Sequence, residues 1–174
     1  MKKQNNILNF KKEKKQRIKS FQRSSLQKTA KKFFDESIES KYSYNFDWFG
    51  IPIIQYPEDI IKLQEIILKT KPDLIIETGI AHGGSVLFHA SMLHLLDATK
   101  SKKNENSPPS QVIAIDIDFK KHNFERLYKN KLSKKIKFIK GSSTSKIVAK
   151  KIKKIAEDYK KIMLILDSNH TSKH

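Results

Sequence analysis

Four positions in this sequence combine a polar side chain with the end of an apolar run. They are Glu77, Asp116, Ser142 and Asp167, and each follows a short stretch rich in isoleucine, leucine or valine. Ligands of open α/β sheets bind outside the carboxyl ends of parallel strands. We therefore expect these side chains to meet at one edge of a sheet, where they would bind a small polar molecule.

The segment from Glu77 to Ser85 could enclose part of a cofactor. Its glycines Gly79, Gly83 and Gly84 allow a tight turn and a close approach of the backbone to a ligand. The spacing departs from the dinucleotide pattern G-x-G-x-x-G and lacks the G-K-[ST] of a phosphate loop, so we do not expect a pyrophosphate there. An acid at the strand end suits a cofactor with a cationic amino group, such as the methionine part of S-adenosylmethionine.

The second and third strand ends could hold a nucleoside. Asp116 stands directly at the end of the run VIAID, where a carboxylate can accept hydrogen bonds from both hydroxyls of a ribose. Asp118 is more simply an acid at the start of the following helix. Ser142 or Ser143 could meet the edge of an adenine, and one hydroxyl of the run S-S-T-S is expected to cap the next helix.

The fourth strand end carries the segment D-S-N-H, from Asp167 to His170. Asp167 could bind a divalent metal through oxygen or help to position a general base. His170 is either a site residue, because it lies beside Asp167, or a polar loop residue. The other histidines lack the spacing of the two-histidine, one-carboxylate set that holds non-haem iron, so we do not expect an iron hydroxylase.

Alternating strands and helices must position these residues. Apolar runs predict strands at 73–78, 112–117, 135–141 and 162–167, and helical spacing predicts helices at 57–69, 85–96, 123–131 and 145–159. The strands are continuously apolar, as expected when both faces of a parallel sheet are covered. The sequence therefore predicts an α/β fold, a Rossmann-like parallel sheet of about four strands with helices on both faces.

Residues 1–32 differ from the rest, and we treat them as an extension ahead of a domain at 33–174. The extension is basic, and Glu13 is its single acid. Its loose helical spacing predicts a solvated helix or a disordered tail, with an amphipathic helix on a membrane surface or on nucleic acid as the alternative. Aromatic residues cluster between 33 and 57, where they would pack on the core, form a wall of the cofactor or substrate site, or do both.

The composition limits the class of protein. The formal net charge of the 174 residues is +18, which favours contacts with polyanions. Lysine greatly outnumbers arginine, the residue that makes bidentate contacts to nucleic acid, so an AT-rich gene explains the charge more simply than a nucleic-acid partner does. The sequence has no cysteine and no run of about 20 apolar residues, so neither disulfides nor a transmembrane segment are expected. A cytoplasmic location is the default expectation.

From about Tyr44 to His174 the sequence resembles the cephalosporin hydroxylase/rhamnosyl O-methyltransferase family. The resemblance is carried by WFGIPIIQYPEDIIKLQEIILKTKPDLIIETGIAHGGSVLFHASML, and then by VIAIDID, KFIKGSST and LILDSNHTSKH in the family's order. The block from Trp48 to Leu87 is the more specific part, and the later motifs would fit many class I methyltransferases. Members of the family are similar to O-methyltransferases that use S-adenosylmethionine and have a Rossmann-like sheet.

The resemblance implies a set of cofactor-binding residues at the strand ends: Glu77, Gly79, His82, Gly83, Gly84, Ser85, Asp116 and Ser142. The first six would lie at the methionine end of the cofactor, the aspartate on the ribose and the last serine near the adenine. Asp167 and His170 are the candidate catalytic residues. The resemblance implies Asp167 as one ligand of a magnesium-type ion that lowers the pKa of the acceptor hydroxyl, so that its oxygen can attack the methyl group.

The expected activity is methylation of a hydroxyl on a small molecule or glycan, such as a sugar, a lipopolysaccharide or glycolipid, or a secondary metabolite. Family members continue beyond D-S-N-H with further strands and an acidic pair, whereas this sequence ends four residues after His170. We therefore expect a truncated domain with an incomplete metal site and an exposed apolar edge on the fourth strand. Two other functions stay open, an inactive cofactor-binding remnant and a basic RNA-binding or RNA-modifying protein. A homo-oligomer and weak association of the basic N-terminus with a membrane surface are compatible with the sequence.

Overall fold

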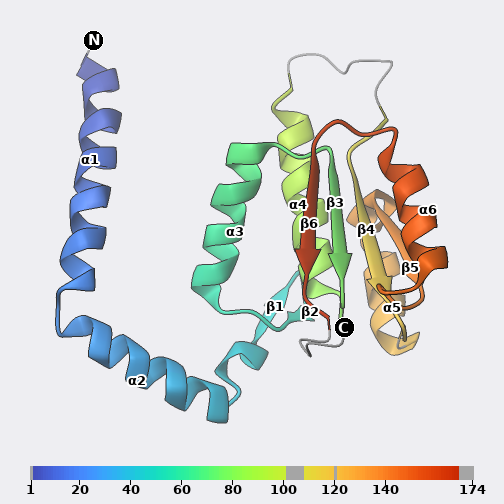
Figure 1. Ribbon diagram of the computed structural model, residues 1–174, viewed down its shortest axis with the longest axis horizontal. Coiled ribbons are helices and arrows are strands. Elements are labelled where there is room, and N and C mark those ends of the chain that lie inside the picture. The colour runs from blue at the N-terminus through green and yellow to red at the C-terminus, as the bar shows by residue number, and fades with distance from the viewer. Residues whose placement is uncertain (1, 101–107, 120, 169–174) are drawn as a thin grey trace. The chain divides into compact units, whose positions relative to one another are not determined.

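The chain forms two compact units, and the boundary between them lies between Tyr42 and Ser43. The computed structural model describes residues 2–100, 108–119 and 121–168. The N-terminal unit contains α1 (Lys2–Gln22) and α2 (Leu26–Glu39), so the extension expected at residues 1–32 is helical apart from a turn at 23–25, and α2 continues beyond it (Figure 1). Within the described ranges, no helix has both the length and the hydrophobicity that a bilayer crossing requires.

The second unit begins with short elements and continues as a regular alternation of strand and helix (Figure 1). The short helix η1 (Tyr42–Asn45) begins at the last residue of the first unit. In chain order the elements that follow it are β1 (Phe46–Trp48), β2 (Ile51–Ile53), α3 (Pro57–Thr70), β3 (Leu74–Thr78), α4 (Gly84–Ala98), β4 (Gln111–Asp116), α5 (Lys121–Lys129), η2 (Lys131–Lys135), β5 (Ile136–Lys140), α6 (Lys146–Ala156) and β6 (Ile162–Leu166). Each of the four predicted strands and four predicted helices is present. The largest difference is at α6, which ends three residues before the predicted end.

The four longer strands form one parallel sheet in the order β5-β4-β3-β6. In the paired register, Ile76 of β3 lies opposite Ile113 of β4 and Leu164 of β6. The chain builds from β3 to β4 and β5, and α6 then returns it to the other side of β3, so the direction of winding reverses between β3 and β6. The predicted Rossmann-like sheet is confirmed, and this reversal is where such sheets bind ligands.

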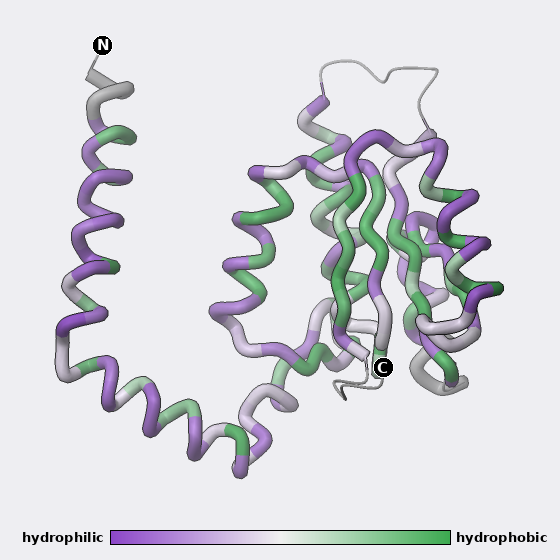
Figure 2. Tube along the Cα trace, in the orientation of Figure 1, coloured by the Kyte–Doolittle hydropathy of each residue, from purple (hydrophilic) through white to green (hydrophobic). Residues whose placement is uncertain are grey.

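Helices cover both faces of the sheet. On one face Ile75 packs with Leu87 of α4 and Ile67 of α3, and on the other Ile113 packs with Val148 of α6. Hydrophobic residues therefore run along the strands while the outer sides of the helices are hydrophilic (Figure 2). Burying each such side chain contributes about 1.5–3 kcal/mol, which explains why the strands are apolar on both sides.

The antiparallel hairpin of β1 and β2 packs against α4. Trp48 donates a hydrogen bond from Nε1 to Ser91 Oγ at 2.9 Å, and its ring meets Phe88 edge-on with centroids 5.0 Å apart. Ile51 and Ile53 of β2 are buried in the same core. Trp48 of the aromatic segment thus packs on the core, while the residues after β2 reach the carboxyl edge of the sheet.

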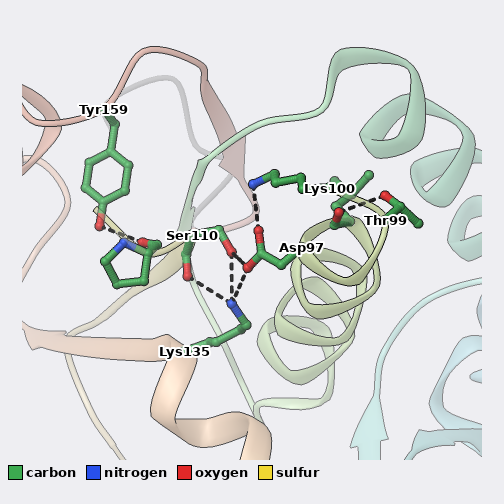
Figure 3. A network of polar contacts seen from close by, with 8 residues as sticks. Asp97, Thr99, Lys100, Ser110, Lys135 and Tyr159 are labelled. Atoms are coloured by element: carbon green, nitrogen blue, oxygen red, sulfur yellow. Dashed lines mark hydrogen bonds and ion pairs between the residues drawn. The ribbon is translucent and has the colours of Figure 1, made fainter. Parts of the chain in front are cut away.

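A polar cluster joins α4 to the amino ends of β4 and β5 (Figure 3). Asp97 accepts hydrogen bonds from Lys100 and Lys135, both at 2.6 Å, and from Ser110. Burial by itself raises the pKa of Asp97, but these hydrogen bonds and the charge of Lys135 outweigh it and lower the pKa to about 2. The cluster therefore fastens the sheet at the end opposite the predicted site.

Candidate functional site

A cavity of about 430 Å³ opens at the carboxyl edge of the sheet. Its volume falls in the range of roughly 300–1,000 Å³ that is typical of small-molecule sites. The wall comes from all four ends of the longer strands, the start of α4, and β2 with the segment after it: Pro52, Ile53, Ile54, Gln55, Gly79, Ile80, Ala81, His82, Gly84, Ser85, Ile115, Asp116, Ile117, Gly141, Ser143, Asp167 and Ser168. The structure thus brings together residues that the sequence predicted separately.

The turn after β3 forms one side of the cavity. Gly79 has a φ of 79°, and a Cβ there would collide with the backbone carbonyl of Asp167, so only glycine fits. Gly84 and Ser85 line the cavity from the first turn of α4, which has no side-chain cap. A helix N-terminus presents backbone N–H groups and the positive end of the helix dipole, so this side of the cavity suits an anion.

Glu77 lies behind this turn and is not part of the cavity wall. It is 1% exposed, and its carboxylate accepts hydrogen bonds from Ser85 Oγ at 2.6 Å and from His89 Nδ1 at 3.0 Å. An ionised carboxylate only accepts hydrogen bonds, so opposite an ionised Glu77 the Nδ1 of His89 is the donor. Glu77 therefore reaches the cavity through Ser85, and its predicted direct contact with a cofactor stays a prediction.

Asp116 ends β4 and lines the cavity. Its Oδ2 accepts the N–H of Ile80 at 2.9 Å, and its Oδ1 accepts the N–H of Asp118 at 3.1 Å. These bonds fix the carboxylate and leave each oxygen with further lone pairs, so both can accept from a pair of hydroxyls. Asp118 is exposed and lies ahead of α5, so the expectation that it starts that helix is wrong.

The end of β5 contributes Gly141 and Ser143 to the wall. Ser142 lies beside them, where its Oγ is 2.8 Å from Thr144 Oγ1 and accepts the Thr144 N–H at 3.3 Å. Ser145 stands at the N-cap of α6, but its side chain makes no capping hydrogen bond. Ser143 is therefore better placed than Ser142 to meet a ligand, and the role of Ser142 stays a prediction.

Asp167 follows β6 and lines the cavity on the side of the winding reversal. Its Oδ2 accepts a hydrogen bond from Gln55 Nε2 at 3.2 Å, and its N–H donates to Thr78 O at 3.0 Å. The described part of the chain contains no group of three His, Cys, Asp or Glu residues that could hold a metal ion. Magnesium often binds through one or two carboxylates and several waters, so Asp167 fits one ligand position without completing a site.

The remaining predicted residues lie in three different places. His82 lines the cavity. Gly83 is the N-cap of α4, with a φ of 92°, and faces Leu127 of α5. His170 lies outside the described residues.

Sequence reasoning missed Gln55 and the isoleucines of the wall, among them Ile80 and Ile117. The signal for Gln55 was the extended segment IPIIQYP, which predicted a wall without saying which side chain would face the cavity. Isoleucines in the turns after strands give no signal of their own, because the sequence is rich in isoleucine throughout.

Residues 40–174 match the family model described as Rhamnosyl O-methyltransferase/CmcI. Among curated proteins, the rhamnosyl O-methyltransferase of Mycobacterium leprae is 33% identical over 128 residues, covering 72% of this chain and 49% of that protein. The rhamnosyl O-methyltransferase of Mycobacterium tuberculosis strain H37Rv is 27% identical over 128 residues, covering 73% and 46%. The chain spans about half the length of the curated relatives it matches.

Two solved structures of CmcI share the fold. One, with Mg and SAM, has a TM-score of 0.52 and 16% sequence identity, covering 74% of this chain and 48% of its own. The other, an apo structure, has a TM-score of 0.51 and 17% identity, covering 75% and 48%. At these identities the likeness concerns the arrangement of strands and helices.

Proposed function

Because the chain belongs to the Rhamnosyl O-methyltransferase/CmcI family, we propose that its cavity binds S-adenosylmethionine and serves the methylation of a sugar hydroxyl. The family supports the class of reaction, and the cavity supports the binding of the methyl donor. The relatives named as rhamnosyl O-methyltransferases support a deoxysugar or related glycan as the acceptor. A cytoplasmic location belongs to the same proposal.

The observation that carries the proposal is the fixed carboxylate of Asp116 in the cavity wall. The N–H groups of Ile80 and Asp118 hold its two oxygens in place, so they are preorganised to accept hydrogen bonds from the 2′- and 3′-hydroxyls of a ribose. The adjacent Ile117 is 68% exposed at the cavity edge and offers an apolar surface to the base. Ser143 on the neighbouring strand end would meet the polar edge of an adenine.

The methionine part of the donor would lie at the start of α4. Its carboxylate suits the N-terminal turn, where Gly84 and Ser85 line the cavity. Glu77 holds Ser85 at 2.6 Å and places a negative charge behind the turn, which favours the cationic amino group and the sulfonium. Glu77 thus acts as a positioning residue and as a source of negative potential.

When bound, S-adenosylmethionine supplies a methyl group on a positively charged sulfur, which is open to in-line attack by an oxygen. Asp167 stands at the β6 side of the cavity with Oδ2 held by Gln55, so its carboxylate can accept the hydrogen bond of an acceptor hydroxyl and orient it. Orientation alone can lower the barrier to such a bimolecular transfer substantially. Asp167 would also supply one of the ligands of a magnesium ion.

Calorimetric titration of the 174-residue chain with S-adenosylhomocysteine tests the proposal. We expect binding at one site, and we expect Asp116→Ala to weaken it about ten- to a hundredfold, because hydrogen bonds to a charged group contribute about 1.5–3 kcal/mol. Asp118 lies two residues after Asp116 and its side chain is exposed. Asp118→Ala removes the same charge at that position, so this variant should bind S-adenosylhomocysteine as the wild type does. Absence of heat with folded wild-type protein, or an equal loss in both variants, would refute the proposed site.

Transfer is measured separately from binding. The chain is incubated with radiolabelled S-adenosylmethionine and rhamnosyl glycosides, with and without magnesium, and label on the sugar is counted. Label transfer supports the complete proposal. Binding without transfer to any glycoside overturns the enzymatic half and leaves a cofactor-binding remnant.

A further inference from the structure

The surface of α1 combines a high positive charge with exposed apolar side chains. Between Lys2 and Arg23 the sequence has nine basic side chains and one acidic side chain, a net charge of +8. In the same helix Ile7, Phe10, Ile18 and Phe21 are 40–61% exposed. Exposed phenylalanines are unfavourable in water, so their presence on a charged helix calls for a partner with both an apolar and an anionic character.

These four apolar side chains lie on one face of the helix. At about 100° per residue they fall within an arc of about 80°. Lys11 and Lys15 flank the arc on one side and Arg17 flanks it on the other. Lys14 projects within the arc, and its long stem allows the ammonium to extend past the apolar groups.

The arginine beside the apolar face is held in position. The guanidinium of Arg17 lies over the ring of Phe10, 5.3 Å from the centroid, and pairs with Glu13 at 3.1 Å. The acid of this helix therefore has a partner on its own helix. The lysines supply the net positive charge around the apolar face.

We propose that α1 binds the surface of an anionic lipid bilayer. The helix would lie in the interfacial plane, with Phe10, Ile18 and Phe21 at the boundary of headgroups and acyl chains and the lysines on anionic headgroups. Nucleic acid offers the negative charge but no apolar layer for these side chains, and Arg17 and Arg23 are the only arginines of the helix and its end. An anionic bilayer satisfies both halves of the surface.

This surface is independent of the proposed methyl transfer. The family match begins at residue 40, after α1 and α2. Membrane binding can therefore succeed or fail whatever the outcome of cofactor titration.

Cosedimentation of the full chain with lipid vesicles tests the proposal. We expect strong binding to vesicles of equal parts phosphatidylcholine and phosphatidylglycerol, weak binding to pure phosphatidylcholine, and a decline with added salt. Phe10→Ser should lower the partition coefficient about tenfold, the effect of removing one large apolar side chain from the interface. Leu8→Ser is the matched control, because Leu8 is equally exposed, 60% against 59%, but lies outside the arc, about 80° from Ile18 and about 160° from Phe10 around the helix.

Equal binding to both kinds of vesicle, or the same loss in the Phe10 and Leu8 variants, would overturn the proposal. The proposal would also be overturned if the protein bound a single-stranded RNA but did not bind anionic vesicles. Thermal unfolding of each variant checks that the second unit is intact. An unfolded Phe10 variant would itself count against the proposal, because an exposed side chain on a solvated helix should not hold the fold together.

Discussion

Two acidic residues end neighbouring strands of this protein and occupy opposite environments. Asp116 faces the cavity, and backbone N–H groups fix its carboxylate. Glu77 is buried, and the side chains of Ser85 and His89 satisfy it. Burial of a carboxylate is costly unless donors surround it, so these two partners are what make the position of Glu77 tolerable.

Replacing His89 with leucine should lower the free energy of unfolding by about 1–3 kcal/mol, because one oxygen of the buried Glu77 loses its donor. Urea denaturation followed by circular dichroism measures this. His94→Leu makes the same change on an exposed part of α4 and should stay within about 0.5 kcal/mol of wild type. If the two variants were equally stable, the hydrogen bond between His89 and Glu77 would make no contribution to the free energy of unfolding.

The residue types at the strand ends were predictable from the sequence, whereas their roles were not. An apolar run followed by an acid indicates a strand end in both cases. Which acid is buried depends on Ser85 and His89, which are eight and twelve positions from Glu77 and face it only once α4 has formed. The choice between Ser142 and Ser143 likewise depends on how the turn after β5 folds, which the run of hydroxyls leaves open.

At the scale of elements, the two ends of α4 serve different purposes. Its N-terminus opens onto the cavity without a side-chain cap, while its C-terminus is tied to β4 and β5 through Asp97. Lys135 donates to Asp97 and, at 2.9 Å, to Ser110 Oγ, so one ammonium links both strands to the helix (Figure 3). Fastening one end of the helix helps to keep the other in register with the cavity.

Asp97→Asn should lower the free energy of unfolding by about 1–2 kcal/mol at neutral pH, allowing for solvent screening of a side chain that is 22% exposed. The pKa of Asp97 is lower in the folded protein than in the unfolded chain. Its stabilising contribution is therefore complete above about pH 4 and is lost as the pH falls toward about 2. Urea denaturation of wild type and variant across this window should show the difference shrinking, and Asp118→Asn should show little difference throughout. A gap that stays constant down to pH 2 would argue against the ion pairs as its cause.

The outer strand β6 is covered on one side in the described part of the chain. Met163 and Ile165 pack against the core, whereas Ile162, Leu164 and Leu166 are 47–68% exposed. A second cavity of about 460 Å³ lies between Leu164 and Leu166 and the side of α6. The sequence predicted a strand covered on both faces and also an exposed apolar edge. In the structure β6 is the outermost strand of the sheet, and only one of its two faces is covered.

We expect the wild-type chain to self-associate through this exposed face, and we expect the double variant Leu164→Thr and Leu166→Thr to do so less, because it removes exposed apolar area while keeping residues that favour strands. Sedimentation velocity over a range of concentrations measures the effect. Met163→Thr is the contrast on the packed side, and we expect it to lower stability instead. Undiminished association of the double variant would show that this face does not drive it.

For the molecule as a whole, the periodicity of apolar residues predicted the fold, because the apolar residues of each strand and helix are the ones that face the core. The runs at β3 and β4 are apolar on both faces, β5 buries Ile136 and Ile139 between exposed lysines, and α6 carries Val148 and Ile152 on one side. The division at Tyr42 was not predictable from the sequence. The first part of α2 resembles the basic extension, whereas its second part contains aromatic residues like those of the following domain, so the sequence placed the boundary within this helix. Gln55 could not be chosen either, because its role depends on β6, which is more than 100 residues away in sequence.

The charge of the whole chain has two separate sources. Residues 2–23 hold +8 of the formal +18, next to exposed apolar side chains, and the remaining charge is distributed along the rest of the sequence, with five lysines in α6. The net charge of the whole chain therefore does not reveal that much of it is concentrated in one patch, residues 2–23. The patch is what the vesicle experiment addresses, and the methyltransferase fold requires no such charge.

A crystal structure of the chain grown with S-adenosylhomocysteine tests the central claim most directly. We expect the nucleoside in the cavity at the carboxyl edge of the sheet, with both ribose hydroxyls within hydrogen-bond distance of Asp116 and the amino acid carboxylate at the N-terminus of α4. A cavity that stays empty at saturating ligand, or a nucleoside bound with its ribose away from Asp116, would contradict the account.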